Sequence, residues 1–258
     1  MSKYIDFDDP HNRDTYVGRS ADPAWSALFA RLMRPEGRLV ADLGCGGGIY
    51  TKAIAGMAPE LVVGMDSSNL SLESARSYCQ GVDRVSLLLT DAEAVGVEDD
   101  VFDRVVERAL IHHFTTLQRN FREARRILKP AGLLWIQDRT VDDVLLPPSA
   151  EHIRGYYLAF DERLRATEIE RRRREPGVTS ALLDAGFRLV SSRKVRELRK
   201  VFREPGELYE EIVLRRGRSL LHALDDGRIR QLADYVVERI PRWPAVERDT
   251  WTVWIAEK

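Results

Sequence analysis

The chain has 258 residues, with 44% hydrophobic and 31% charged side chains and a formal net charge of −1. This length suffices for one large α/β domain with a full core, and the near-zero charge lacks the basic excess that phosphate-backbone binding needs. No run approaches the roughly 18 apolar residues of a membrane span, and the polar N-terminus shows no secretory signal. Two cysteines, Cys45 and Cys79, form no disulfide framework, so we expect a cytoplasmic protein.

Short apolar runs alternate with helical patterns through the first half of the chain. In the stretch 116–128, Leu117, Phe121 and Leu128 fall on one face at helical spacing, which predicts an amphipathic helix. Nearly continuous apolar strands separated by helices are typical of a parallel sheet that is covered on both faces. The expected strands are 38–43, 61–66, 84–89, 102–107 and 132–138, and the expected helices are 49–58, 69–79 and 116–128.

The pattern changes after residue 138. A Pro-Pro turn at 147–148 precedes a helical stretch around Tyr156, and the run 170–175, four arginines between two acids, favours a solvated helix face. No linker rich in Gly, Ser or Pro interrupts the chain, so we expect one domain with an insertion after the fifth strand. The remaining expected elements are a helix at 179–186, a strand at 187–198, helical segments near 206–224 and 227–240, and a strand at 250–258.

The most informative stretch is VADLGCGGG, residues 40–48, which joins the first strand to its helix. Open α/β sheets bind ligands at this edge, and glycines let the backbone take positive φ and approach a ligand closely. The dinucleotide pattern G-x-G-x-x-G fails, because Ile49 stands where the third glycine belongs. The pattern acid-x-G-x-G-x-G fits, with Asp42, Gly44, Gly46 and Gly48.

Successive segments of the first half resemble, in order and spacing, the landmarks of the class I S-adenosyl-L-methionine-dependent methyltransferases. The resemblance covers roughly residues 35–138 and is greatest to the small-molecule branch that includes the ubiquinone and menaquinone biosynthesis methyltransferases. It implies a Rossmann-like, mostly parallel seven-stranded α/β sheet with helices on both faces, an antiparallel last strand and a helical insertion after strand five. The segments are 40–51, 62–68, 88–95, 102–114 and 124–136.

The same resemblance implies a cofactor, S-adenosyl-L-methionine, with S-adenosyl-L-homocysteine as its product. It divides the single domain of residues 1–258 into four parts. These are N-terminal lid helices at 1–35, a cofactor-binding core at 36–138, a substrate-side insertion at 139–175 and a C-terminal part of sheet and helices at 176–258.

The resemblance also assigns roles to individual residues. The glycine turn and Asp42 would hold the methionine part of the cofactor, and Asp66, which ends the second strand, would accept both ribose hydroxyls. Asp91 would bond the adenine amino group, Glu107 would line the methionine arm, and the Y-x-x-R pair before the core would form a lid. The residues implied for the cofactor are Tyr16, Arg19, Asp42, Gly44, Cys45, Gly46, Asp66, Ser67, Asp91, Ala92, Glu93 and Glu107.

Several of these residues have a purely structural alternative. Asp66 is also a candidate N-cap of the next helix, although Ser67 and Ser68 offer others. Asp91 also suits a plain turn, and the Y-x-x-R pair also suits a surface ion pair. No cluster of Cys, His, Asp or Glu has metal-ligand spacing, so we expect no metal site.

Transfer from an activated sulfonium depends on alignment, and a general base is needed only where the nucleophile arrives protonated. We expect the acceptor pocket over strands four and five, beneath the insertion. The adjacent His112 and His113 suit either the fold or, for one of them, a base. The candidate lining residues are His113, Asp138, Arg139, Tyr156 and Tyr157, of which His113, Asp138 and Tyr156 are the catalytic candidates.

Residues and resemblance together predict transfer of a methyl group to an O, N or C nucleophile of a small molecule by in-line displacement. An RNA methyltransferase, a nicotinamide oxidoreductase and a non-catalytic cofactor-binding member of the fold are the alternatives. We expect a small-molecule acceptor as partner, no nucleic acid, no membrane span, and a monomer or homodimer.

Overall fold

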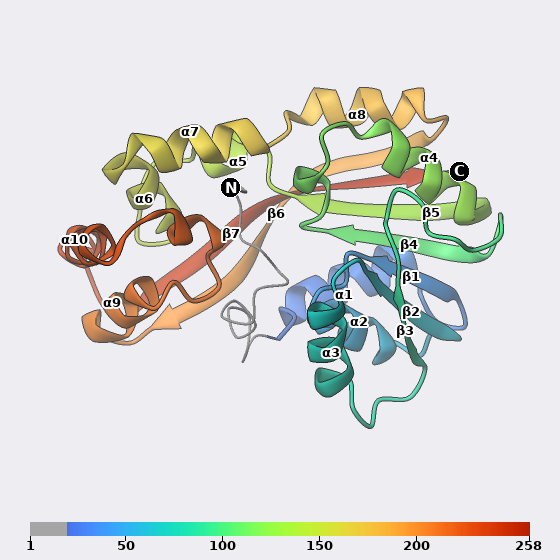
Figure 1. Cartoon of the computed structure of the whole chain (residues 1–258), viewed down its shortest axis with the longest axis horizontal. Coiled ribbons are helices and arrows are strands. Elements are labelled where there is room, and N and C mark those ends of the chain that lie inside the picture. The colour runs from blue at the N-terminus through green and yellow to red at the C-terminus, as the bar shows by residue number, and fades with distance from the viewer. Residues whose placement is uncertain (1–19) are drawn as a thin grey trace. The chain divides into compact units, whose positions relative to one another are not determined.

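The computed structural model describes residues 20–258, in which seven strands form one mixed sheet (Figure 1). The strands are β1 (Leu39–Leu43), β2 (Leu61–Asp66), β3 (Val85–Leu89), β4 (Phe102–Arg108), β5 (Leu128–Asp138), β6 (Arg188–Phe202) and β7 (Ala245–Glu257). Their order in the sheet is β3-β2-β1-β4-β5-β7-β6. The first five strands pair in parallel, and β7 runs antiparallel to β5. The predicted fold class is therefore confirmed.

The strand register brings the ends of four parallel strands to one edge of the sheet. Leu43, which ends β1, pairs with Met65 of β2 and with Glu107 of β4. Asp66 ends β2 and pairs with Leu89, the last residue of β3. The turns that follow these strands gather at that edge, where open α/β sheets bind their ligands.

Helices cover both faces of the sheet, as predicted (Figure 1). They are α1 (Pro23–Met33), α2 (Ile49–Ala55), α3 (Asn69–Tyr78), α4 (Gln118–Ile127) and α8 (Glu175–Asp184). On one face Phe29 of α1 lies against Trp135 of β5, with ring centroids 5.3 Å apart. Neighbouring strand residues face opposite sides, so Val106 packs in the core under α1 and Val105 in the core that Phe121 of α4 shares.

The chain divides into two compact units, each with a core of its own. Of the described residues, one unit contains 20–138, 173–195 and 252–258 and holds the parallel strands. The other contains Arg139–Arg172 and Arg196–Trp251, and its core includes Tyr157 and Phe202. Strands β6 and β7 contribute residues to both units. The four-part division of a single domain stays a prediction.

The second unit contains the predicted helical insertion. Its helices are α5 (Val141–Val144), α6 (Arg154–Phe160), α7 (Glu162–Arg171), α9 (Pro205–Val213) and α10 (Asp226–Val237), with a short 3-10 helix at Ser219–Ala223. The single helical segment expected near 206–224 is wrong. Arg215 and Gly217 take φ of 54° and 62°, and left-handed backbone cannot continue a right-handed helix.

The expectation of a solvated helix face at 170–175 is also wrong in part. Arg171 and Arg172 are buried, and both form ion pairs with Glu168, which is itself fully buried in α7. The composition of a charge run does not reveal that a buried partner, here Glu168, lies two residues before the run.

None of the helices within residues 20–258 is both long and apolar enough to span a bilayer.

Candidate functional site

The glycine turn follows β1 directly and depends on left-handed backbone. The φ angles are 68° at Gly44, 51° at Gly46 and 80° at Gly48, a region that glycine enters at least cost. The N–H of Cys45 donates to the carbonyl of Met65 at 2.9 Å, which ties the turn to the end of β2. Burial raises the pKa of the Cys45 thiol well above its usual range, so Cys45 packs beneath the turn as a thiol.

Two glycines of the turn face different surroundings. A Cβ on Gly44 would lie 2.6 Å from Leu110 Cδ1, whereas a Cβ on Gly46 would have no heavy atom of residues 20–258 within 4 Å. Gly44 is therefore packed against the loop after β4, while Gly46 presents bare backbone to open space. A ligand that approaches the main chain closely requires such a surface.

We expect Gly44→Ala to lower the free energy of unfolding by about 1–3 kcal/mol and Gly46→Ala by about 1 kcal/mol. Positive φ costs an alanine about 1 kcal/mol at either position, but only at position 44 must Leu110 also move. Urea unfolding of both variants measures the difference. Equal losses would mean that Leu110 gives way without cost.

Asp66 fixes its carboxylate beside the open part of the turn. Its Oδ2 accepts the N–H of Gly46 at 2.8 Å, and its Oδ1 accepts the N–H of Ser68 at 3.0 Å. A carboxylate has about four acceptor positions, so each oxygen keeps capacity for a further donor such as a ribose hydroxyl. The N-cap of α3 is Ser68, whose hydroxyl accepts the N–H of Ser71 at 3.1 Å. The alternative of Asp66 as that N-cap is therefore wrong.

The loop after β3 adjoins Asp66. The N–H of Thr90 donates to the carbonyl of Asp66 at 3.0 Å. Asp91 is exposed, and its Oδ1 accepts the N–H of Glu93 at 2.8 Å, which closes a turn around Ala92. Asp91 therefore builds a turn, as the structural alternative predicts. Its bond to the adenine amino group stays a prediction.

Asp42 lies in the buried end of β1. It is 2% exposed, and its Oδ2 accepts the hydroxyl of Thr51 in α2 at 2.6 Å. Burial raises the pKa of Asp42 to about 7, although the bond from Thr51 opposes the shift. Asp42 therefore anchors the helix that follows the turn. Its predicted contact with the methionine part of the cofactor stays a prediction.

Glu107 points its carboxyl group at helix α4. It is fully buried, and its Oε1 accepts a hydrogen bond from Asn120 Nδ2 at 3.1 Å. Asn120 also donates to the carbonyl of Ala92 at 3.3 Å. Sequence reasoning missed Asn120, because a polar residue inside an otherwise amphipathic helix pattern gives no signal of its buried partner.

The structure pairs Asp138 with His112. Asp138 Oδ2 lies 2.7 Å from His112 Nδ1 and 3.3 Å from the backbone N of His112. The His113 ring is exposed and lies against the His112 ring, with centroids 4.1 Å apart. The structure thus pairs the Asp138 carboxylate with His112, whereas the sequence analysis selected His113 as the catalytic candidate.

The other three acceptor-site candidates belong to the second compact unit. The Tyr156 hydroxyl donates to the carbonyl of Arg239 at 3.1 Å, and Arg139 pairs with Asp249 at 2.6 Å. Tyr157 is buried, with the Arg218 guanidinium 4.8 Å from its ring centroid. These contacts stabilise that unit. A role for the three side chains toward an acceptor stays a prediction.

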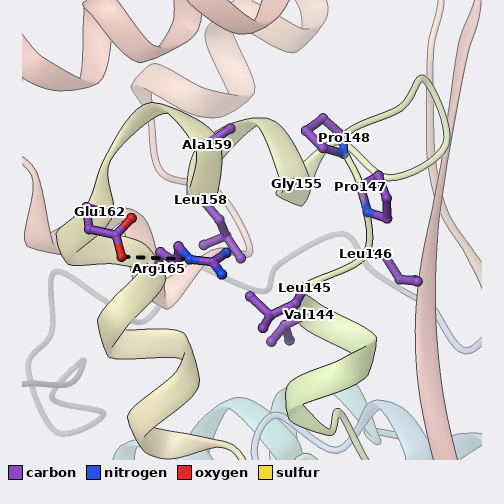
Figure 2. Close-up of a pocket in the computed structure, with 10 residues that line it drawn as sticks. All are labelled: Val144, Leu145, Leu146, Pro147, Pro148, Gly155, Leu158, Ala159, Glu162 and Arg165. Carbon is purple, nitrogen blue, oxygen red and sulfur yellow. Dashed lines mark ion pairs between the residues drawn. The ribbon is translucent and has the colours of Figure 1, made fainter.

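A pocket of about 300 Å³ lies in the second unit, between α5, α6 and α7 (Figure 2). Eight of its ten lining residues are aliphatic, proline or glycine, and the other two, Glu162 and Arg165, pair at 3.7 Å. None of the sequence-predicted site residues within 20–258 lines this pocket. Of the remaining predicted residues, Ser67 is exposed beside Asp66, and Tyr16 and Arg19 lie outside the described residues.

The first unit alone thus presents a bare backbone turn, a fixed carboxylate and an exposed loop acid at one sheet edge. These features fit a nucleoside with an amino-acid tail, because a carboxylate suits a vicinal diol and backbone amides suit a carboxylate. The fit rests on the open space at Gly46 and the anchored Asp66 carboxylate.

Comparison with known proteins agrees with this geometry. Residues 41–136 match the protein family described as "Methyltransferase domain". Methyltransferase GfsG of Streptomyces halstedii is 33% identical over 143 residues, 53% of this chain and 51% of that protein. A ubiquinone biosynthesis O-methyltransferase of Rhizobium johnstonii is 29% identical over 157 residues, 57% of this chain and 60% of that protein. A tRNA methyltransferase of Mus musculus matches over 47% of this chain and 18% of its own length.

Among solved structures, an S-adenosylmethionine-dependent methyltransferase of Mesorhizobium loti has a TM-score of 0.55 at 16% identity, covering 98% of this chain and all of that one. This likeness shows the shared fold. The chain spans between about one fifth and three fifths of the length of the first curated relatives it matches. Residues 41–136 thus match a methyltransferase domain, in agreement with the predicted resemblance to the class I S-adenosylmethionine-dependent methyltransferases.

Proposed function

We propose that this protein transfers the methyl group of S-adenosylmethionine to a small-molecule acceptor, at an O, N or C nucleophile, by in-line displacement. The observation that carries the proposal is the Asp66 carboxylate, anchored at 2.8 Å by the N–H of Gly46, a glycine whose Cβ position has no heavy atom of the described residues within 4 Å. The matched methyltransferase domain, which spans both residues, supports it.

Each part of the cradle has a chemical task in this proposal. Asp66 accepts the two ribose hydroxyls, and the loop at Asp91, Ala92 and Glu93 faces the adenine. The open backbone at Gly46 lies against the methionine part. When bound, the cofactor supplies a methyl group already activated on a sulfonium, so the chain contributes mainly alignment and exclusion of water.

We assign the proton-transfer role, where the acceptor needs one, to His112 rather than His113. A carboxylate that binds Nδ1 orients an imidazole and stabilises its protonated form, and Asp138 lies at 2.7 Å from that atom of His112. Asp138 is then a positioning residue. Tyr156 is a weaker candidate, since its hydroxyl is bonded to a backbone carbonyl.

The small-molecule acceptor is favoured over RNA by charge. The formal net charge of −1 supplies little attraction to a phosphate backbone, although a tRNA methyltransferase is among the matches. We further propose a cytoplasmic location, which suits two buried cysteines that form no disulfide, and a monomer or homodimer.

Titration calorimetry with S-adenosylhomocysteine tests the proposal. We expect micromolar binding at one site per chain and no heat with NADH, because the turn lacks the third glycine of the dinucleotide pattern. Filter binding with total tRNA at low and physiological salt is the control for the RNA alternative. Absence of S-adenosylhomocysteine binding would contradict the proposal. Salt-sensitive binding of tRNA would mean that the acceptor is RNA and not a small molecule.

A further inference from the structure

Glu107 of β4 and Asn120 of α4 form a polar pair in the core between the sheet and α4. Both side chains are fully buried. Asn120 Nδ2 donates to Glu107 Oε1 at 3.1 Å and to the carbonyl of Ala92 at 3.3 Å. The pair therefore links the end of β4 to the loop after β3, whose Asp91, Ala92 and Glu93 we assign to the adenine.

Each member of the pair has one buried oxygen that lacks a hydrogen-bond partner among residues 20–258. These atoms are Glu107 Oε2 and Asn120 Oδ1. Within residues 20–258 no ion pair forms on the Glu107 carboxyl group. Among the described residues, an ionised Glu107 would thus have no cation as a partner, and two buried acceptors would have no donor. Burial of an unpaired charge and of unpaired acceptors each costs free energy.

A single proton removes both deficits. We propose that Glu107 is held as a neutral carboxylic acid whose Oε2–H donates to Asn120 Oδ1, so that acid and amide close a two-bond ring that positions the Ala92 carbonyl. No atom beyond the proton is needed, because the amide already donates to Oε1. The consequence for cofactor binding rests on the proposed function, whereas the acid–amide ring does not.

The surroundings of Glu107 favour the neutral form. Burial raises the pKa of Glu107 to about 8, the bond from Asn120 opposes that shift, and the Asp138 carboxylate adds to it. Asp138 on β5 is the charged group that faces Glu107 from the neighbouring strand, and it is paired with His112. From α4 the facing group is the Asn120 amide, and from the loop it is the Ala92 carbonyl, neither of which titrates.

The raised pKa has a definite sign for stability. Between the unfolded value near 4.5 and the folded value near 8, the folded state holds a proton that the unfolded state has lost. The contribution of Glu107 to stability is thus fully present below about pH 4.5 and is lost as the pH rises to about 8. Above that pH the ring opens, and the Ala92 carbonyl loses its fixed donor.

Glu107→Gln is the matched variant. A glutamine amide donates to Asn120 Oδ1 and accepts from Nδ2, as the neutral acid does, but it does not ionise. In full-length protein labelled with ¹³C-glutamate, we expect one side-chain carboxyl resonance to titrate near pH 8 and to be missing in Glu107→Gln. A spectrum in which every glutamate is ionised at about pH 6.5 overturns the proposal.

Unfolding gives an independent readout. The folding equilibrium constant of wild type, relative to Glu107→Gln, should fall by up to about tenfold per pH unit between pH 5 and 8, because one proton is released. Both proteins keep Asp42, whose raised pKa also makes stability fall as the pH rises. This contribution cancels in the ratio of the two folding equilibrium constants. A pH-independent ratio overturns the proposal. If Glu107→Gln does not fold, the resonance is assigned instead by its displacement in Asn120→Ser.

Affinity for S-adenosylhomocysteine tests the positioning role. Between about pH 7 and 9 we expect the Kd to rise severalfold more in wild type than in Glu107→Gln, which also controls for titration of the ligand's own amino group. Equal pH dependence refutes the positioning role. If neither protein binds the ligand at any pH, the proposed function fails, and the carboxyl resonance alone decides whether the acid–amide ring exists.

Discussion

Asp66→Ala is expected to weaken binding of S-adenosylhomocysteine by about 100-fold or more. In the proposed complex the carboxylate accepts two ribose hydroxyls, and a hydrogen bond to a charged acceptor contributes about 1.5–3 kcal/mol. The loss of two such bonds, about 3 kcal/mol at the lower limit, corresponds to about a 100-fold higher Kd. The variant also removes the acceptor of the Gly46 N–H, so the turn itself loses an anchor. Titration calorimetry at neutral pH measures the change.

A matched control separates this effect from a change in net charge. Asp83 is an exposed acid that precedes β3, at the opposite edge of the sheet from Asp66. Asp83→Ala removes the same charge and should leave the Kd unchanged. Circular dichroism and thermal unfolding of Asp66→Ala without ligand check that the fold persists. An affinity equal to that of wild type would refute the assignment of Asp66 to the ribose and remove the main support for the proposed function.

The parts of the site that could be predicted from sequence are those that local pattern determines. The glycine spacing predicts a turn that needs positive φ, and the structure has positive φ at Gly44, Gly46 and Gly48. An acid directly after an apolar run predicts a carboxylate at the end of a strand, as Asp66 is. The backbone of a strand and the turn that follows it depend on residues that are adjacent in the chain.

The direction of a side chain at the sheet edge depends on packing that sequence does not show. Val105 and Val106 face opposite sides of β4, so Glu107 returns to the side of Val105. That side is covered by α4, which makes Glu107 a core residue with Asn120 as its partner. Alternation alone predicts the side, but not which helix covers it or which polar residue that helix brings.

The choice between His112 and His113 needed tertiary structure for a similar reason. Both histidines lie in the short 3-10 helix Ile111–His113, and their rings contact each other. Which ring reaches Asp138 depends on the register of β4 against β5, in which Arg108 pairs with Gln137. Adjacent identical residues offer no compositional difference by which to choose between them.

The buried arginines of the second unit were the least predictable feature, and they carry the largest expected effect on stability. Glu168 lies in α7 with no exposed surface and pairs with Arg154 at 3.2 Å, with Arg172 at 3.5 Å and with Arg171. The three guanidinium groups hold the pKa of this carboxyl well below its usual range, even though burial alone would raise it. The Glu168 carboxylate is therefore paired with three buried guanidinium groups.

Glu168→Gln is expected to lower the free energy of unfolding by about 3–5 kcal/mol, because removing one partner of a buried ion pair leaves the other charge uncompensated. The exposed Glu162 of the same helix pairs with Arg165 at 3.7 Å, so Glu162→Gln should cost less than about 1 kcal/mol. Chemical denaturation of both variants near pH 7 makes the comparison.

The stability difference should also depend on pH. A carboxyl group whose pKa is depressed in the folded state stabilises the fold above its unfolded pKa near 4.5, and this contribution is lost on acidification. The difference between wild type and Glu168→Gln should therefore shrink below about pH 4. Equal costs for the two variants would mean that solvent or other groups already screen the arginines around Glu168.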